Sequence, residues 1–288
     1  MNDKTPTDSK NKNLTERIVA FVDILGFKNM VHDSLNSQES ANNLHEALKR
    51  IYDLKNHNES PTEVTSLREF GVEISTFSDS IVISYPIDYE GGLFFILMEL
   101  IHLQLDLACY GILIRGGLSI GLLYHDGNIV YGPAMNEAYY LESKCAIYPR
   151  IIINKEDIIE GICKTRAEQN TMEQDIKYVM SCLKVDDDER FYLDILRQHQ
   201  ELGDWGDEYY NWLVNIRKTI VSGLNQYSNS PRIYKKYNWL KKYYNDVVTD
   251  RNALYPVPDE SYCDQIGFRR SYLNLKIKKR ISKGSDFW

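Results

Sequence analysis

The sequence has no extended block of one charge. Its 288 residues include 34 Lys and Arg against 41 Asp and Glu, which gives a net charge of −7 at pH 7 and a pI near 5.5. Proteins that bind duplex nucleic acid need a basic surface to neutralise phosphates. We therefore do not expect duplex DNA or RNA as the main partner. A small anionic substrate needs only a local positive pocket and remains compatible with this composition.

Cysteine is scarce, and the common catalytic signatures are missing. The chain has no CxxC pair, no GxxxxGK[ST] phosphate loop and no GxSxG nucleophile motif, and its six histidines show no metal-ligand spacing. Odd, widely spaced cysteines are typical of reduced thiols that fill the core rather than of disulfides or zinc sites. The five are Cys109, Cys145, Cys163, Cys182 and Cys263.

Hydrophobic segments of the secretory or membrane-spanning kind are also missing. Residues 1–16 are polar, lack an apolar signal region and are predicted to be a disordered tail. The apolar run 93–111 carries Glu99, His102 and Asp106 at helical spacing, which places a polar stripe on one face. We expect a buried helix there, no membrane association and a cytoplasmic location.

The pattern of apolar residues predicts an α+β domain. The elements alternate as strand, helix, strand, strand, helix, strand, which is the ferredoxin-like βαββαβ order with helices on an antiparallel sheet. A hairpin tip at Asp126-Gly127, with an exposed His125 beside it, a helix and a last strand follow. The predicted ranges are strands 17–26, 70–76, 79–85, 112–123 and 148–154, and helices 38–56, 91–110 and 133–146.

Composition changes after residue 154. All four tryptophans and more than half of the tyrosines lie in 155–288, where 207–222 and 232–248 have helical patterns and 190–196 fits a short strand or helix. This part is predicted to be a helical, aromatic-rich extension that follows a catalytic domain over 17–154. Its aromatic residues are interpreted as packing residues, and its role is left open.

Two aspartates interrupt strands that should bury apolar residues. Asp23 lies in FVDILGF and Asp79 in TFSDSIVIS, on the first and third strands, which are central neighbours in this topology. Either one alone would be read as a solvent-facing or turn residue. Together they can converge at one end of the sheet, where mutual repulsion calls for neutralisation. Two Mg²⁺ or Mn²⁺ ions, which prefer carboxylate and phosphate oxygens, would supply it.

Four motifs in order resemble class III nucleotidyl cyclases. They are FVDILGF at 21–27, TFSDSIVIS at 76–84, IRGGLSIG at 114–121 and GPAMNEAYYLE at 132–142. Each is weak alone, and the resemblance covers only 17–154. It implies conversion of a nucleoside triphosphate to a 3′,5′-cyclic monophosphate and pyrophosphate, in sites shared across a homodimer.

The resemblance also implies roles for individual residues. Asp23, Asp79 and the carbonyl of Ile24 would hold two Mn²⁺ or Mg²⁺ ions. Gly26 and Phe27 would open the loop and helix whose N–H groups hold the triphosphate. Asn136 would orient the ribose from the partner subunit. These roles are expectations carried over with the motif.

One departure from the family concerns the transition-state cation. Four residues after the asparagine the family has an arginine, whereas this chain has Tyr140. Loss of such a cation would cost several kcal/mol of transition-state stabilisation. Arg115 is the first candidate to replace it, although it also fits a structural ion pair. Lys144 and Arg150 are further candidates, for which a solvated surface role is the simpler interpretation.

A second departure concerns the base. Ser75 and Ile129 occupy the two positions at which the family distinguishes adenine from guanine, and neither carries a purine code. The words DILGF, FSDS, YGPA and YPR resemble a divergent branch, the cyclases of bacterial Pycsar antiphage systems. That branch makes cyclic CMP or cyclic UMP as a second messenger for a separate effector, so a pyrimidine nucleotide is the predicted substrate.

Three alternatives stay open from sequence. A purine cyclase with an unfamiliar base pocket would use the same chemistry. A non-catalytic, nucleotide-binding member of the family would explain Tyr140, although both aspartates are retained. A diguanylate-cyclase or CRISPR-polymerase palm is disfavoured because FSDS does not match its Gly-Gly-Asp hairpin. The choice of pyrimidine, the trigger and the effector cannot be read from the residues.

Overall fold

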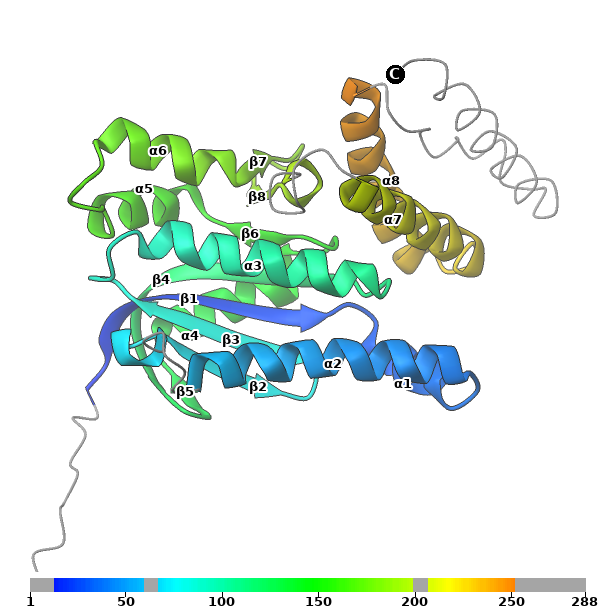
Figure 1. The fold of residues 1–288 in the computed structure, drawn as a ribbon, viewed down its shortest axis with the longest axis horizontal. Helices are drawn as coiled ribbons and strands as arrows, with labels where there is room; N and C mark the ends of the chain where they lie inside the picture. The colour runs from blue at the N-terminus through cyan, green and yellow to red at the C-terminus, as the bar shows by residue number, and fades with distance from the viewer. Residues whose placement is uncertain (1–12, 60–66, 199–206, 252–288) are drawn as a thin grey trace, which may run out of the picture. The chain divides into compact units, whose positions relative to one another are not determined.

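The computed structural model describes residues 13–59, 67–198 and 207–251 (Figure 1). The chain divides into two compact units, Met1–Asn215 and Ile216–Trp288, which are described separately below. Residues 1–12 of the predicted tail lie outside the described residues, as do residues 252–288 of the predicted extension.

The first half of the chain forms the predicted succession of strands and helices. The ranges that were predicted agree with the structure to within a few residues, because periodicity identifies an element better than its ends, whereas α1 and η1 were not given ranges from the sequence. The elements are β1 (Thr15–Ile24), α1 (Phe27–Ser34), α2 (Gln38–Glu59), η1 (Leu67–Phe70), β2 (Glu73–Phe77), β3 (Ser80–Pro86), α3 (Gly92–Cys109), β4 (Ile114–Asp126), β5 (Ile129–Tyr131) and α4 (Pro133–Tyr140).

The sheet confirms the predicted α+β, ferredoxin-like core. Its strand order is β2-β3-β1-β4-β6-β8-β7, with β5 paired to β4, so the first four strands are arranged as β2-β3-β1-β4. The pairs β1–β3, β1–β4 and β2–β3 are all antiparallel. Strands β1 and β3 are therefore central neighbours, as the element order predicts.

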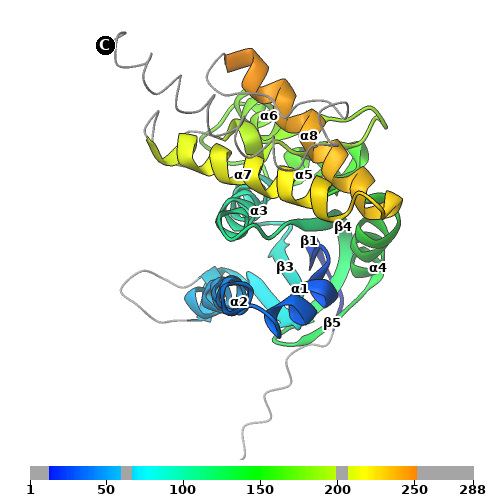
Figure 2. The same cartoon turned by 90° about the vertical axis from the view of Figure 1, so that its right-hand side faces the viewer.

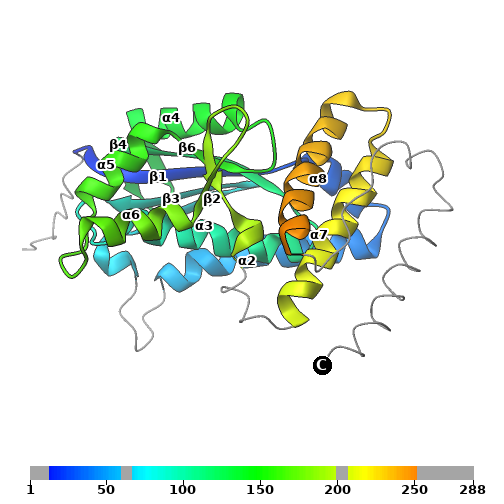
Figure 3. The same ribbon diagram turned by 90° about the horizontal axis from the view of Figure 1, so that it is seen from above.

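Helices cover both faces of this sheet. Figures 2 and 3 show α2 and α3 on one face and α4 on the other. Because successive strand residues point to opposite faces, Ile18, Ala20 and Val22 of β1 are buried on one side. Val19 on the other side packs in a small apolar cluster with Ala138 of α4. The residues of β1 that precede Asp23 therefore anchor this strand to both layers.

Helix α4 lies very close to strand β4. A Cβ atom added at Gly117 would fall 2.4 Å from the carbonyl oxygen of Ala138 and from Cβ of Leu141. Glycine is thus required by close approach of the two backbones. The predicted helix 133–146 is divided here, because α4 continues as a π-helix, η2 (Leu141–Cys145). A π-helical turn widens the backbone and changes the direction of its side chains.

Helix α3 is the apolar run predicted to be a buried helix, and this is confirmed. It is long and apolar enough to cross a membrane by length and composition alone, but 61% of it is buried within the structure. Leu93, Leu97 and Leu100 are each 1% exposed or less. Burial of this kind is the ordinary situation of a core helix in a folded domain.

The chain after residue 154 adds both helices and strands. Strands β7 and β8 extend the sheet beyond β6, and the segment predicted as strand or helix forms β8 followed by the short η3. The predicted boundary between 154 and 155 lies inside the first compact unit. The elements are β6 (Ile151–Ile153), α5 (Lys155–Lys164), α6 (Met172–Ser181), β7 (Leu183–Val185), β8 (Phe191–Leu193), η3 (Ile195–Arg197), α7 (Asp207–Gln226) and α8 (Pro231–Arg251).

The second unit is built from the end of α7 and from α8. Gly223 lets the Tyr237 ring approach, since an added Cβ would lie 2.3 Å from that ring. Tyr237 also stacks on Tyr227, with ring centroids 5.9 Å apart. Aromatic residues of this region therefore pack between the two helices, as their interpretation as packing residues predicts.

Candidate functional site

The two predicted metal-binding aspartates lie at the same edge of the sheet. Asp23 is the penultimate residue of β1, and Asp79 lies in the tight turn between β2 and β3. The antiparallel register pairs Asp23 with Ser80, and the Ile24 N–H donates to the Asp79 carbonyl oxygen at 3.2 Å. The carboxyl groups of Asp23 and Asp79 are close enough to share a hydrogen bond. Convergence follows from strand direction, since the end of β1 meets the start of β3.

The two carboxyl groups at this edge repel each other when both are ionised, which favours binding of a cation. Burial and then the Asp79 charge raise the pKa of Asp23 to about 6, while the Arg115 guanidinium opposes that rise. Two carboxylates this close disfavour joint ionisation unless a positive charge is near. Arg115 Nη2 lies 3.4 Å from Asp23 Oδ2 and provides one such charge from the facing position on β4.

Arg115 is itself held by a residue to which the sequence assigned no role. Its Nη2 lies 2.6 Å from Oε1 of Glu142, whose side chain is 3% exposed in the π-helix η2. A buried carboxylate normally needs such a partner. The sequence signal was available, because Glu142 closes the motif GPAMNEAYYLE. The structure therefore places Arg115 beside Asp23 and in an ion pair with Glu142, which was its alternative interpretation, and its catalytic role stays a prediction.

The residues predicted to hold the triphosphate follow directly after Asp23. Gly26 has φ +84°, in the left-handed region that favours glycine, and forms the N-cap of α1. Phe27 is the first helical residue. The opening turn of a helix presents backbone N–H groups without partners inside the helix, which suits an anion. The motif DILGF thus joins one carboxylate to the start of a helix over a few residues.

Four other predicted residues are exposed and stand apart from this carboxylate pair. Asn136 and Tyr140 are on the exposed side of α4, Lys144 is exposed in η2, and Ile129 is 61% exposed on β5. Over the ranges that the structure covers, no hydrogen bond or ion pair joins any of them to Asp23 or Asp79. Whether they meet a substrate depends on a second subunit and stays a prediction.

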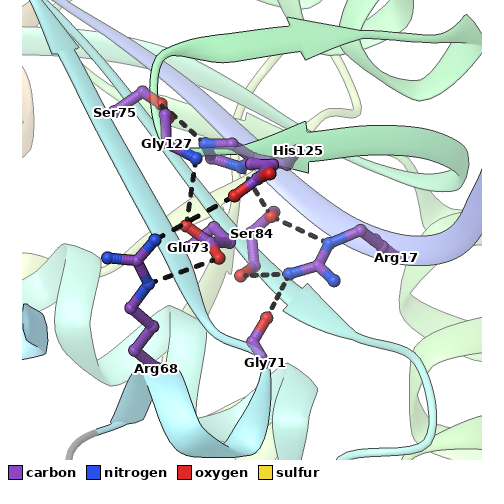
Figure 4. A network of polar contacts seen from close by, with 9 residues as sticks. Arg17, Arg68, Gly71, Glu73, Ser75, Ser84, His125 and Gly127 are labelled. Atoms are coloured by element: carbon purple, nitrogen blue, oxygen red, sulfur yellow. Dashed lines mark hydrogen bonds and ion pairs between the residues drawn. The ribbon is translucent and has the colours of Figure 1, made fainter. Parts of the chain in front are cut away.

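Ser75 lies in a buried polar network instead of beside the carboxylates (Figure 4). Its hydroxyl lies 2.7 Å from His125 Nε2 and also contacts the Gly127 carbonyl. His125 Nδ1 lies 2.7 Å from Ser84 Oγ, which accepts from Arg17 Nε at 2.9 Å. The prediction of an exposed His125 was wrong, because the β4–β5 hairpin folds back and leaves the residue 8% exposed.

The hydrogen bonds of this network can all be made by a neutral imidazole. Arg17 donates to Ser84, so the Ser84 hydroxyl hydrogen is available for His125 Nδ1, and Nε2–H then donates to Ser75. Burial and then the positive charge of Arg17 lower the pKa of His125 to about 3. Protonation would place a buried positive charge close to Arg17.

We therefore expect His125 to make folding pH-dependent. Its pKa is near 6.5 in the unfolded chain, so the unfolded state binds the extra proton first and stability falls as pH drops from about 6.5 towards about 3. At pH 5 the loss should be about 2 kcal/mol. Thermal unfolding at pH 7.5 and pH 5 should show a smaller decrease for His125→Gln than for the unchanged protein. The exposed His32→Gln serves as control, and equal decreases in all three proteins would refute this assignment.

Arg150 is buried, so the interpretation of a solvated surface role was wrong. Its side chain is 1% exposed, pairs with Asp186 and Asp188, and lies over the Tyr148 and Tyr192 rings. The acids come from the β7–β8 hairpin, which lies 36 to 38 residues after Arg150 in the sequence. Arginine is suited to this combination of bidentate pairing and ring stacking. Arg150 therefore stabilises the fold and is committed to its two carboxylates.

The donor set suits a hard divalent cation. No cluster of three or more His, Cys, Asp or Glu side chains that could hold a metal is found among the residues covered by the structure. Mg²⁺, however, is commonly bound through one or two carboxylates, with waters and substrate phosphates as the other ligands. The half-buried pair Asp23 and Asp79, with the Ile24 carbonyl beside it, meets that requirement.

Comparison with known proteins gives little further support. No protein-family model and no curated protein matches this chain. A solved structure described as a bacterial light-regulated adenylyl cyclase is similar to it with a TM-score of 0.30 and 16% sequence identity. The match covers 55% of this chain and 46% of that chain, which is less than half of the matched protein. A TM-score of 0.30 is too low to establish shared function, so the residues of this chain must support any proposal.

Proposed function

We propose that this protein is a metal-dependent nucleotidyl cyclase that converts a pyrimidine nucleoside triphosphate, CTP or UTP, to its 3′,5′-cyclic monophosphate and pyrophosphate. The observation that carries the proposal is the meeting of Asp23 and Asp79 at one sheet edge, next to the left-handed Gly26 and the start of α1. Carboxylates for a divalent ion and N–H groups for phosphates are the two elements that nucleotidyl transfer needs.

Each residue of this edge then has a definite task. Asp23, Asp79 and the Ile24 carbonyl hold Mn²⁺ or Mg²⁺, which on binding would activate the 3′-hydroxyl and neutralise charge on the phosphates. Backbone N–H groups that begin at Phe27 orient the triphosphate. Arg115, held by Glu142, offers a guanidinium where negative charge develops. It replaces the arginine that the related family has at the position of Tyr140.

The preference for pyrimidines is supported by the state of Ser75. This position would read a purine base in the related family, but its hydroxyl is occupied by His125 and Gly127. A base-reading site needs donors and acceptors that are available to the ligand. In this proposal the active form is a homodimer in which Asn136 of one subunit completes the site of the other. The product acts as a second messenger for a separate effector in antiphage defence.

A second candidate is a nucleotide-binding member that does not turn over. Arg115 is engaged with both Asp23 and Glu142, and Tyr140 carries no charge. If Arg115 cannot leave these carboxylates, the transition state loses the cation that this proposal assigns to it. Binding without product would then be the outcome.

Product analysis tests the proposal and separates these candidates. We expect incubation with Mn²⁺ and CTP or UTP at pH 7.5, followed by mass spectrometry, to yield cyclic CMP or cyclic UMP. ATP and GTP, incubated separately, should give much less cyclic product. A cyclic purine would keep the chemistry and reject the pyrimidine assignment. Triphosphate binding without any cyclic product, in a folded protein, would favour the non-catalytic candidate.

A further inference from the structure

A cavity lies between α2 and α3, on the face of the sheet opposite to Asp23. Its volume is about 490 Å³, within the range of small-molecule sites. Tyr85 of β3 lines it, and the strand alternation places Tyr85 on the face covered by α2 and α3, while its neighbour Ser84 points to the face of α4. The proposed cyclase chemistry makes no use of this cavity.

The walls of the cavity are largely aromatic and apolar. Tyr85, Tyr89 and Phe95 form a continuous edge-to-face series, with ring centroids 5.5 Å and 6.0 Å apart. Met98 and Leu103 of α3 add flexible aliphatic surface. Phe95 lines the cavity and is 47% exposed, so part of its ring is accessible to a ligand and is not packed in the core. Such a lining favours a flat, unsaturated ligand.

A carboxylate lies within this apolar lining. Glu99 Oε2 accepts a hydrogen bond from the Tyr85 hydroxyl at 2.6 Å, so this hydrogen-bond partner is a neutral phenol and not a cation. Burial raises the pKa of Glu99, a rise opposed by the Tyr85 hydrogen bond and by His102. A carboxylate in apolar surroundings gains stability from any cation that reaches it.

The remaining charges around the cavity also leave a negative excess. Asp53 and Asp106 line it together with Glu99, against the single guanidinium of Arg50. Arg50 is exposed, and Tyr110, Asp106 and Asp53 all act on it and raise its pKa. Asp106 and Asp53 thus offset the arginine charge, while Glu99 is hydrogen-bonded to Tyr85. His102 completes the polar stripe of α3 that the sequence shows at helical spacing.

We propose that this cavity binds a small aromatic cation, such as a benzylic amine or an aryl amidine, with its ring against Tyr85, Tyr89 and Phe95 and its charged nitrogen on Glu99. Aromatic walls supply stacking and cation–π attraction, and the carboxylate supplies a charge-assisted hydrogen bond. A triphosphate or other anion is excluded by the three acids. The site is independent of cyclase chemistry, because its residues belong to the other face of the sheet.

Three probes of one shape and different charge test the site. Benzamidine, benzamide and benzoate carry one positive, no and one negative charge at pH 7.5. Methionines labelled with ¹³C in the methyl group report binding, and the Met98 signal is assigned with Met98→Leu. Benzamidine should shift the Met98 signal with half-saturation at about 1 mM. Benzamide should need about tenfold more, and benzoate should give no shift.

Matched variants locate the charge preference. Glu99→Gln keeps an acceptor for the Tyr85 hydroxyl and should remove the advantage of benzamidine over benzamide, whereas the exposed Glu168→Gln should keep it. Phe95→Ala, at a partly exposed position, should weaken both probes and remains informative if Glu99→Gln does not fold. Equal Met98 shifts with all three probes, shifts confined to other methionines, or no shift with any probe would each overturn the proposal.

Discussion

Replacing Asp79 by Asn is expected to lower cyclic nucleotide formation by about 10³-fold, because the metal site loses one of its two carboxylates. Asp79 lies in the turn between β2 and β3, with its carbonyl oxygen held by the Ile24 N–H. That backbone bond does not involve the side chain, so Asn should preserve the fold. The initial rate with Mn²⁺ and the preferred triphosphate measures the effect.

Two controls make the result specific to the carboxylate pair. Asp33→Asn, a substitution at a half-exposed position of α1, should leave the rate unchanged. Mn²⁺ titration should show weaker binding to Asp79→Asn than to Asp33→Asn at pH 7.5, above the pKa of about 6 that burial and Asp79 impose on Asp23. An Asp79→Asn protein that keeps full activity would remove Asp79 from the reaction.

Mixing two inactive variants is expected to restore activity if subunits share their sites. Asn136 is exposed on α4, and no contact connects it with Asp23 or Asp79 over the ranges that the structure covers. In a mixture of Asp79→Asn and Asn136→Ala subunits, half of the dimers carry one of each, and one of their two sites keeps both residues. About a quarter of the full activity should therefore return, although each variant alone is nearly inactive.

Subunit exchange has to be shown in the same experiment. Differently tagged subunits should co-purify after mixing, and the restored rate should rise with the fraction that does so. A control mixture of Asp79→Asn with Asp23→Asn, both on one side of the proposed shared site, should stay inactive. Restored activity in that control, or none in the first mixture despite exchange, would contradict the sharing of sites between subunits.

Much of the core was predictable because its signals are local or topological. Periodicity identified β1 to β4 and α3, and the βαββαβ order required β1 and β3 to be neighbours. Once these strands are antiparallel, Asp23 and Asp79 must meet at one edge. Gly26 could be predicted as well, since a glycine between a strand and a helix commonly has a positive φ.

Other features were not predictable from the sequence, because they depend on contacts between distant segments. His125 directly precedes the turn dipeptide Asp126-Gly127, which predicts an exposed position, yet its ring contacts Ser75 and Ser84. Arg150 was predicted to be a surface cation, but it is buried and pairs with Asp186 and Asp188 of the β7–β8 hairpin. Burial of a polar residue is decided by such partners and not by its neighbours in sequence.

The sequence by itself determined the α+β class, the central strands and the carboxylate pair at their common edge, because hydrophobic period and strand direction are written locally in the chain. Only the tertiary structure decided which polar side chains are already engaged in hydrogen bonds or ion pairs. Arg115 is held between Asp23 and Glu142. Ser75 is hydrogen-bonded to His125, and an acidic, aromatic cavity lies between α2 and α3. The physical reason is that charge pairing and cavity shape act through space, over separations that sequence patterns do not record.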